Sequence, residues 1–304
     1  MTNLRRQEGQ VTVLVAVFMV VLVGMAGFAI DVGSWFRQQR ASQSTVDAAA
    51  LAGAQSLPDD TAGATTMATT YAGKNGGSAG AAITFTSRYA PNDTISVQQS
   101  RPAAGFFSSV LGISTVTVRA HASAISELPT AVMGAAPIAV DIHHPMLSGN
   151  GCPCFSVPTT IDLGKKGVPG AFGLIDLDTH NGNTGNSTLG HWIASGYNQY
   201  LALGDYDSDP GAKFDSSEIQ DALQNKYGSD LLFPVYDSLA GNGSNAPYHV
   251  VGWAAFHVTL SQASGNSGTI SGWFDHVIWS GIVPASGPSP DMPDLGVHSV
   301  ALVD

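Results

Sequence analysis

The acidic segment Asp205-Tyr-Asp207-Ser-Asp209 places three carboxylates at alternate positions of the chain. Calcium-binding loops use this spacing because alternate side chains can direct their oxygens at one cation. The segment therefore indicates calcium as a candidate ligand of Asp205, Asp207 and Asp209. The alternative is an acidic turn that leads into a helix. Pro210 and Ser216 favour this alternative, because they stand where an EF-hand loop has its glycine and its glutamate.

A shorter acidic segment, Asp176-Leu-Asp178, is a weaker candidate for the same chemistry. Its alternative interpretation is the end of a strand, followed by an Asn-Gly turn.

Two pairs of metal-ligating residues, His143-His144 and Cys152-Pro-Cys154, lie close together in the chain. Histidine and cysteine are the usual ligands of zinc and copper. The Cys-x-Cys spacing is one residue shorter than in common zinc sites, and the chain has only 2 cysteines. The alternative is a proline-rich loop in which Cys152 and Cys154 are either free thiols or joined in a disulfide, as an oxidising compartment would favour.

Motifs of catalysis are not found in the sequence. It contains no G-x-S-x-G nucleophile elbow, no P-loop and no G-x-G-x-x-G after a predicted strand. Ser195-Gly196 is typical of a helix end, and Asp275-His276 lies inside a predicted strand, where a structural histidine is the simpler interpretation. We therefore predict a protein that is not an enzyme, needs no cofactor and has no identified small-molecule substrate.

The composition restricts the class of partner. Lys and Arg total 12 against 23 Asp and Glu, so the net charge is −11. Nucleic-acid binding requires clustered basic residues, and this balance argues against a nucleic-acid partner. Few basic residues and 35 glycines are typical of a polar extracytoplasmic surface. Two cysteines exclude a disulfide-dense scaffold.

The elements that must position these residues form an α+β chain whose distal domain, residues 128–304, is rich in strands. Residues 248–260 and 270–280 are apolar on both faces, as expected of central strands in a covered sheet. We predict a sandwich or barrel with two inserted helices. One helix carries Leu189, Trp192 and Ile193, and the other starts at a capping box, Asp215 to Glu218, and ends near Gly228. Shorter strands are predicted over residues 136–141, 172–177 and 232–236.

A smaller α+β domain is predicted over residues 58–127. It has a weak helix over residues 61–71 and alternating strands over residues 83–86, 94–98 and 115–123. Between the last two strands, Phe106, Phe107, Val110 and Leu111 recur at helical spacing. We therefore expect a small antiparallel sheet with helices on one face.

The N-terminal segment determines where these domains lie. Residues 11–30 contain no charge, and a helix of about 20 residues spans roughly 30 Å, the thickness of the hydrocarbon core of a bilayer. Trp35 then lies where an aromatic belt lies. We predict residues 1–10 as a cytoplasmic tail, 11–30 as a transmembrane helix and 31–57 as its extracytoplasmic extension. The chain is then a single-pass protein of the cell membrane with extracytoplasmic domains.

A cleaved secretory signal is the alternative interpretation of this segment. Arg5 and Arg6 would form the basic region, and Gly27-Phe28-Ala29 would form the cleavage site. The apolar run is longer than the 7–15 residues typical of a signal peptide, and this favours a retained anchor.

A stripe of small residues, made of Val46, Ala49, Ala50 and Ala54, follows the apolar run at helical spacing. Small side chains allow a neighbouring helix to approach closely. The stripe predicts either association with a helix of a partner protein or packing on the chain's own domain. The sequence does not distinguish the two.

Three N-terminal stretches carry a family resemblance: Arg5-Arg-Gln-Glu-Gly-Gln-Val, Ala29-Ile-Asp31-Val-Gly33 and Asp47-Ala-Ala-Ala-Leu-Ala-Gly-Ala54. Over residues 5–56 the chain resembles TadE/TadG-like proteins of Flp (Tad) pilus assembly. The resemblance implies a bacterial, pseudopilin-like envelope protein with the membrane and other pilus-assembly proteins as partners. Separately, a long N-terminal helix that leads into a small antiparallel sheet is a pilin-like plan, by analogy of fold. The alternative function is a tethered extracellular binding module that uses calcium through residues 205–209.

Overall fold

The structure is a computed structural model that divides the chain into two compact units. The first unit comprises residues 1–126 and 301–304, and the second comprises residues 127–300. The α+β fold class predicted from the sequence is confirmed. The sequence did not predict that the last residues of the chain return to the first unit. The described residues are 7–77, 82–164, 173–178, 184–209, 213–241, 246–264, 267–285 and 292–303.

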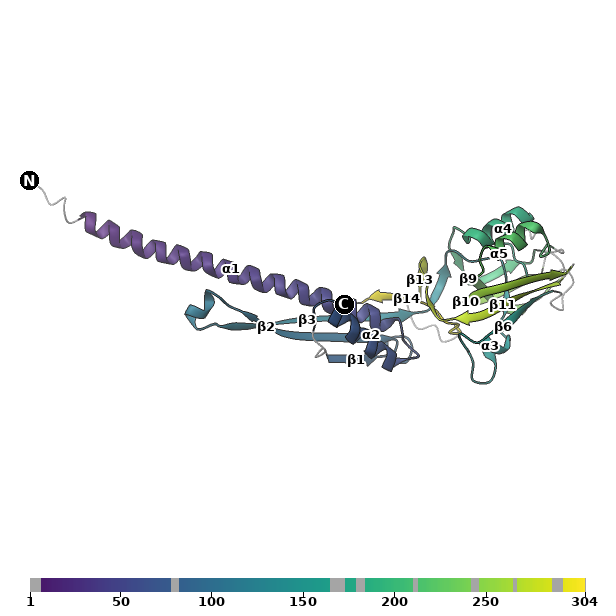
Figure 1. Ribbon diagram of the computed structural model, residues 1–304, viewed down its shortest axis with the longest axis horizontal. Helices are drawn as coiled ribbons and strands as arrows, with labels where there is room; N and C mark the ends of the chain where they lie inside the picture. The colour runs from purple at the N-terminus through teal and green to yellow at the C-terminus, as the bar shows by residue number, and fades with distance from the viewer. Residues whose placement is uncertain are drawn as a thin grey trace, which may run out of the picture. The chain divides into compact units, whose positions relative to one another are not determined.

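The first unit begins with a continuous helix, α1, which spans Gln7–Ala54 (Figure 1). Every residue of Val11–Ile30 except Gly27 is exposed, and we call this stretch the apolar half. The stretch Ala41–Ala54, in which buried positions recur, is the packed half. The helix ends three residues before the predicted limit at Leu57, because Pro58 has no N–H to donate to the carbonyl oxygen of Ala54.

The packed half is covered by the rest of the first unit. Helix α2 (Thr61–Lys74) packs on α1 through alanines, and its N-cap residue Asp60 accepts a 2.7 Å hydrogen bond from the Gly63 N–H. Strands β1 (Ala82–Thr86), β2 (Thr94–Ala104) and β3 (Thr115–Glu127) form an antiparallel sheet, and β2 packs against α1 (Figure 1). The predicted small sheet with helices is therefore present.

The segment between β2 and β3, residues 105–114, is called the apolar loop. The sequence predicted a helical stripe here that would pack on the sheet. In the structure β2 continues to Ala104, and the loop contains only a short 3₁₀ turn, Ser108–Leu111. Its large apolar side chains are exposed, so the prediction that they form a packed helix face was wrong.

The second unit contains a mixed six-stranded sheet in the order β5-β9-β10-β11-β6, with β8 also paired to β10. The long strand β10 is central and buried on both faces, as predicted. A second, three-stranded sheet has the order β13-β4-β7. The strands of this unit are β4 (Pro129–Val132), β5 (Val140–Asp141), β6 (Thr159–Leu163), β7 (Leu201–Ala202), β8 (Gly204–Asp207), β9 (Ser229–Leu239), β10 (Pro247–Ser264), β11 (Ser267–Asp275), β12 (Val277–Ile278), β13 (Ile282–Pro284) and β14 (Val297–Leu302), whose last residues belong to the first unit.

Helices α4 (Asn186–Ser195) and α5 (Ser217–Gln224) pack on each other, and α5 packs on β10. A third helix, α3 (Pro145–Ser148), is a single turn. The core beneath them is aromatic and aliphatic. Phe256 contacts both Phe233 and Phe274 through ring centroids 5.9 and 5.0 Å apart. This core holds the sheet whose strand β8 carries Asp205 and Asp207.

Four sequence predictions for the second unit need correction. The predicted strand 136–141 forms only at Val140–Asp141, as β5. The predicted strand 172–177 is absent from its described residues, because Leu174 and Ile175 make only isolated bridges; Phe172 lies outside the described residues. The predicted strand 270–280 is interrupted at His276, after which β12 pairs with β14 in parallel. Helix α5 starts after Ser216, and no side chain caps it. It has already ended at Gln224, so the predicted capping box and the end near Gly228 were both wrong.

Candidate functional site

The apolar half of α1 has large apolar side chains on its surface, and their contact with water would be unfavourable. Val20 is 73% exposed and Leu14 is 70% exposed. The helix is long and apolar enough to cross a membrane. All backbone groups within such a helix bond to each other, which is a condition for crossing hydrocarbon. This half of α1 is therefore suited to a lipid environment.

The stripe of small residues lies in the packed half, and the chain itself covers it. Val46, Ala49, Ala50 and Ala54 are all buried. Around Gly53, on the same half, an added Cβ would lie 2.5 Å from Ile95 Cδ1 and 3.2 Å from Ala68 Cβ. The stripe therefore packs on α2 and β2. The interpretation that it associates with a partner's helix was wrong, because no surface of these residues remains exposed to one.

Asp31 lies directly after the apolar half and holds the apolar loop against α1. Its carboxylate accepts hydrogen bonds from the backbone N–H groups of Phe106 (3.0 Å) and Ser108 (2.6 Å). Trp35 Nε1 donates to the carbonyl oxygen of Ala104 at 3.0 Å, one turn further along. Sequence reasoning gave Asp31 no role of its own. An acidic residue that immediately follows an apolar run on the same helix was the available signal, since a buried carboxylate needs hydrogen-bond partners.

The predicted calcium ligands have separate partners in the second unit. Asp205 Oδ1 lies 2.6 Å from Nδ1 of His249, and this hydrogen bond is the main cause of a raised His249 pKa. Asp209 is buried, accepts a hydrogen bond from the Thr184 N–H and forms an ion pair with Lys213. Burial raises the pKa of Asp209, against the opposing effect of Lys213.

The described residues contain no group of three His, Cys, Asp or Glu side chains placed to hold a metal ion. Pro210 and Gly211, which follow the acidic segment, lie outside the described residues. Calcium binding through Asp205, Asp207 and Asp209 stays a prediction. Calorimetric titration of the full chain with calcium, with and without a chelator, tests it.

The two acidic segments line one open cleft of about 300 Å³. Burial raises the pKa of Tyr206 to about 12, and its hydroxyl donates a 2.7 Å hydrogen bond to the carbonyl oxygen of Ala202. This cleft offers carboxylate acceptors to a polar or cationic ligand. Sequence reasoning did not predict it, because its two acidic edges are far apart in the chain. The charged and aromatic residues of the lining are Asp176, Asp178, Asp205, Tyr197, Tyr200 and Tyr206.

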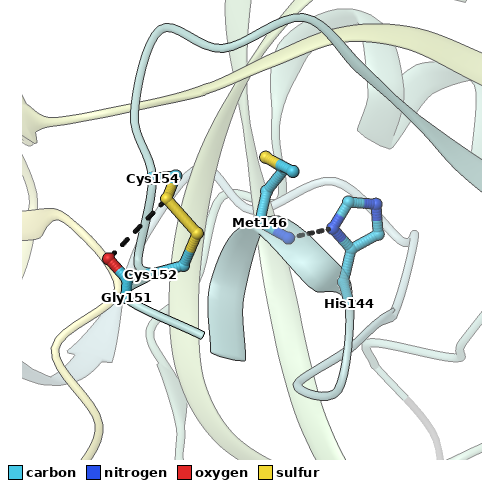
Figure 2. Close-up of a disulfide and its surroundings, with 5 residues drawn as sticks. All are labelled: His144, Met146, Gly151, Cys152 and Cys154. Carbon is cyan, nitrogen blue, oxygen red and sulfur yellow. Dashed lines mark hydrogen bonds between the residues drawn. A yellow bond between two sulfur atoms is a disulfide. The ribbon is translucent and has the colours of Figure 1, made fainter. Parts of the chain in front are cut away.

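Cys152 and Cys154 are joined in a disulfide, shown in Figure 2. Sγ of Cys154 lies 3.9 Å from the carbonyl oxygen of Gly151. This contact is not a hydrogen bond, because the sulfur of a disulfide carries no proton. The ring of His144 is occupied as well: Nδ1 accepts a hydrogen bond from the Met146 N–H at 3.2 Å, which caps α3 (Figure 2). The zinc or copper interpretation was wrong, because the disulfide leaves no thiolate to bind a metal.

Comparison with known proteins locates a relationship at the N-terminus. Residues 9–56 match the Tad family model, described as "Putative Flp pilus-assembly TadE/G-like". This confirms the resemblance read from the sequence and supports a role in Flp pilus assembly. The matched residues include both halves of α1 and Asp31. No curated protein and no solved structure matches the chain.

Proposed function

We propose that the chain is a membrane-anchored, pseudopilin-like component or accessory of an Flp (Tad) pilus-assembly system and is not an enzyme. The single observation that carries the proposal is the change along α1. Every residue of the apolar half except Gly27 is exposed, and buried positions recur through the packed half under its own unit. The match to the Tad family model covers both halves. Such a helix is suited to anchor the chain in a bilayer and to support a folded unit outside it.

The orientation that we propose places the N-terminus in the cytoplasm and both units outside it. The disulfide between Cys152 and Cys154 supports this orientation, because disulfides persist in oxidising compartments. The acidic net charge of −11 is compatible with an extracytoplasmic surface. The partners would be other pilus-assembly proteins, which contact exposed surfaces of the chain.

The proposal is tested in cells that carry the Flp machinery. The full chain, tagged at its C-terminus, is expected to stay in the membrane pellet after alkaline carbonate extraction. External protease should degrade the tagged units in spheroplasts. It should leave them intact in sealed inside-out membrane vesicles, because the units then lie in the lumen. Recovery of the full chain in the soluble fraction would contradict the membrane anchor, and protection of the tag in spheroplasts would contradict the orientation.

The pilus role needs a separate measurement. Deletion of the gene is expected to reduce surface pili, and the full chain supplied in trans should restore them. The detergent-extracted chain should also co-purify with other components of the pilus machine. A deletion strain with normal pili, together with no co-purified component, would contradict the role while leaving the anchor intact.

A further inference from the structure

The apolar loop exposes its large side chains. Val110 is 86% exposed, Leu111 is 76% exposed and Phe106 is 69% exposed. Phe107 and Ile113 are also exposed, and none of the residues 105–114 carries a charge. Exposed apolar clusters of this kind mark interaction sites with proteins or membranes. The position of the loop on α1 decides between these two.

The loop is fixed to the end of the apolar half. Its backbone donates to the Asp31 carboxylate from Phe106 and Ser108, at 3.0 and 2.6 Å. The Phe107 ring lies so close over Gly27 that an added Cβ there would be 2.6 Å from Phe107 Cγ. Figure 1 shows the hairpin of β2 and β3 running back along α1 within the first unit.

These contacts set the depth of the loop. At about 1.5 Å per residue, Gly27 lies roughly 4.5 Å inside the end of the apolar half at Ile30. Trp35, which bonds to the base of the loop, lies roughly 7.5 Å beyond Ile30. If the apolar half spans the hydrocarbon core, the loop is level with the outer boundary of that core.

Several backbone N–H groups of the loop form hydrogen bonds within the loop, as an apolar medium requires. Hydrogen bonds within the loop satisfy the N–H groups of Gly105 (2.9 Å, to Ser114), Val110 (3.2 Å), Gly112 (3.0 Å) and Ile113 (3.0 Å). The hydroxyl of Ser108 donates to Ile113 and that of Ser109 donates to Phe106. Unsatisfied backbone groups are costly in hydrocarbon, so this pattern permits partial insertion.

We propose that the apolar loop is a second membrane contact, which inserts Phe106, Val110 and Leu111 into the outer leaflet of the bilayer that α1 spans. The inference rests on the proposed membrane anchor. The occupant is lipid, because the loop continues the apolar surface of α1 at the same depth. Arg37 and Arg40 follow on exposed positions of α1, roughly 10 and 15 Å beyond Ile30, where polar headgroups lie. The helix and the loop together would fix the height and tilt of the first unit on the membrane.

The test uses the full chain reconstituted in vesicles of phosphatidylcholine and phosphatidylglycerol. Single cysteines are introduced at Leu111 and Val110 in the loop, at Val20 in the apolar half and at Thr65 on the exposed side of α2. A nitroxide label is attached without reductant, since Cys152 and Cys154 are joined in a disulfide. Collision with oxygen, which concentrates in lipid, is compared with collision with a water-soluble nickel chelate. The oxygen-to-nickel ratio at Leu111 and Val110 is expected to exceed that at Thr65 several-fold and to approach that at Val20.

Each outcome separates the loop from the anchor. A high ratio at Val20 with a Thr65-like ratio at both loop positions would overturn the loop inference and leave the anchor intact. A Thr65-like ratio at Val20 would overturn the anchor itself. Protection of both loop positions from both reagents would indicate contact with a second copy of the chain, and this too would overturn insertion into lipid.

Discussion

The two halves of α1 reverse the usual relation between side-chain size and burial. The apolar half carries valine, leucine, methionine and phenylalanine and is exposed, whereas the packed half carries alanine and is buried. In a water-soluble protein the large apolar residues would be the buried ones. The reversal indicates that the two halves meet different surroundings. The large residues are suited to lipid, and the small ones allow α2 and β2 to approach the helix closely.

The largest expected effect comes from placing charge in each half. Arginine at both Val17 and Val20 should prevent stable insertion, because each charge near the middle of a span costs about 2.5–3.5 kcal/mol. Carbonate extraction should then release the chain, and hydrogen exchange should still find β2 and β3 protected. The matched change Ala49→Arg should leave the chain in the membrane pellet and unfold the first unit, since an unpaired buried charge costs about 3–5 kcal/mol.

The comparison between the halves fails if the two variants change the same measurement. Release of the Ala49→Arg chain by carbonate, or lost protection of β2 in the chain with two arginines, would show that anchor and unit are one cooperative structure. A conservative control, Val20→Leu, should alter neither measurement, because it keeps the apolar half apolar.

A smaller effect is expected from adding a single methyl group to α1. Gly53→Ala should destabilise the first unit by about 1–3 kcal/mol, because its Cβ would lie 2.5 Å from Ile95 Cδ1 and 3.0 Å from the carbonyl oxygen of Ala64. Gly33→Ala is the matched control. Nothing lies within 4 Å of its Cβ, so stability should be unchanged or rise by up to about 1 kcal/mol. Urea unfolding of the full chain in non-ionic detergent measures both.

An unchanged stability of the Gly53→Ala chain would count against the packing described for the packed half. If Gly53→Ala were neutral, Ile95 and α2 would have to move away at little cost. That freedom is not expected around residues as buried as Ile95 and Ala64.

The sequence was sufficient for the elements whose signal is local. The apolar run, the helix through Val46 and Ala54, and the central strand β10 each follow from composition and periodicity over neighbouring residues. It was insufficient where two distant segments meet. The stripe could not be assigned to its own domain or to a partner, because both need the same small residues. The cleft between Asp176 and Asp205 and the bonds from Asp31 to the apolar loop likewise depend on the tertiary fold.

The apolar loop illustrates a different limit. Phe106 to Leu111 have helical spacing, which predicts a face that packs on a sheet. In the structure the strand register between Ala104 and Thr115 leaves these residues at the tip of a hairpin, where no sheet lies beneath them. Periodicity identified the apolar residues and could not indicate that their side chains would stay exposed.

The smallest expected effect is the dependence of the first unit on pH. Asp93 precedes β2, whose Ile95 packs on α1, and its buried carboxylate accepts backbone hydrogen bonds from Arg88 (2.8 Å), Tyr89 (2.6 Å) and Ala90 (2.7 Å). Burial alone would raise the pKa of Asp93, but these hydrogen bonds outweigh it and lower the pKa below the ordinary value of 3.8. The folded state therefore binds this proton less readily than the unfolded chain does.

The sign of the pH effect follows from this difference. Asp93 contributes stability above about pH 3.8, the value of the unfolded chain, and the contribution is lost as the pH falls towards the lower pKa of the folded state. Asp93→Asn should lower the stability at neutral pH and flatten the loss of stability below pH 4, because the amide does not ionise. Urea midpoints of the full chain in detergent between pH 3 and pH 7 measure both effects. An equally steep acid loss in the variant would assign that loss to other carboxylates and remove Asp93 from the support of β2 against the packed half.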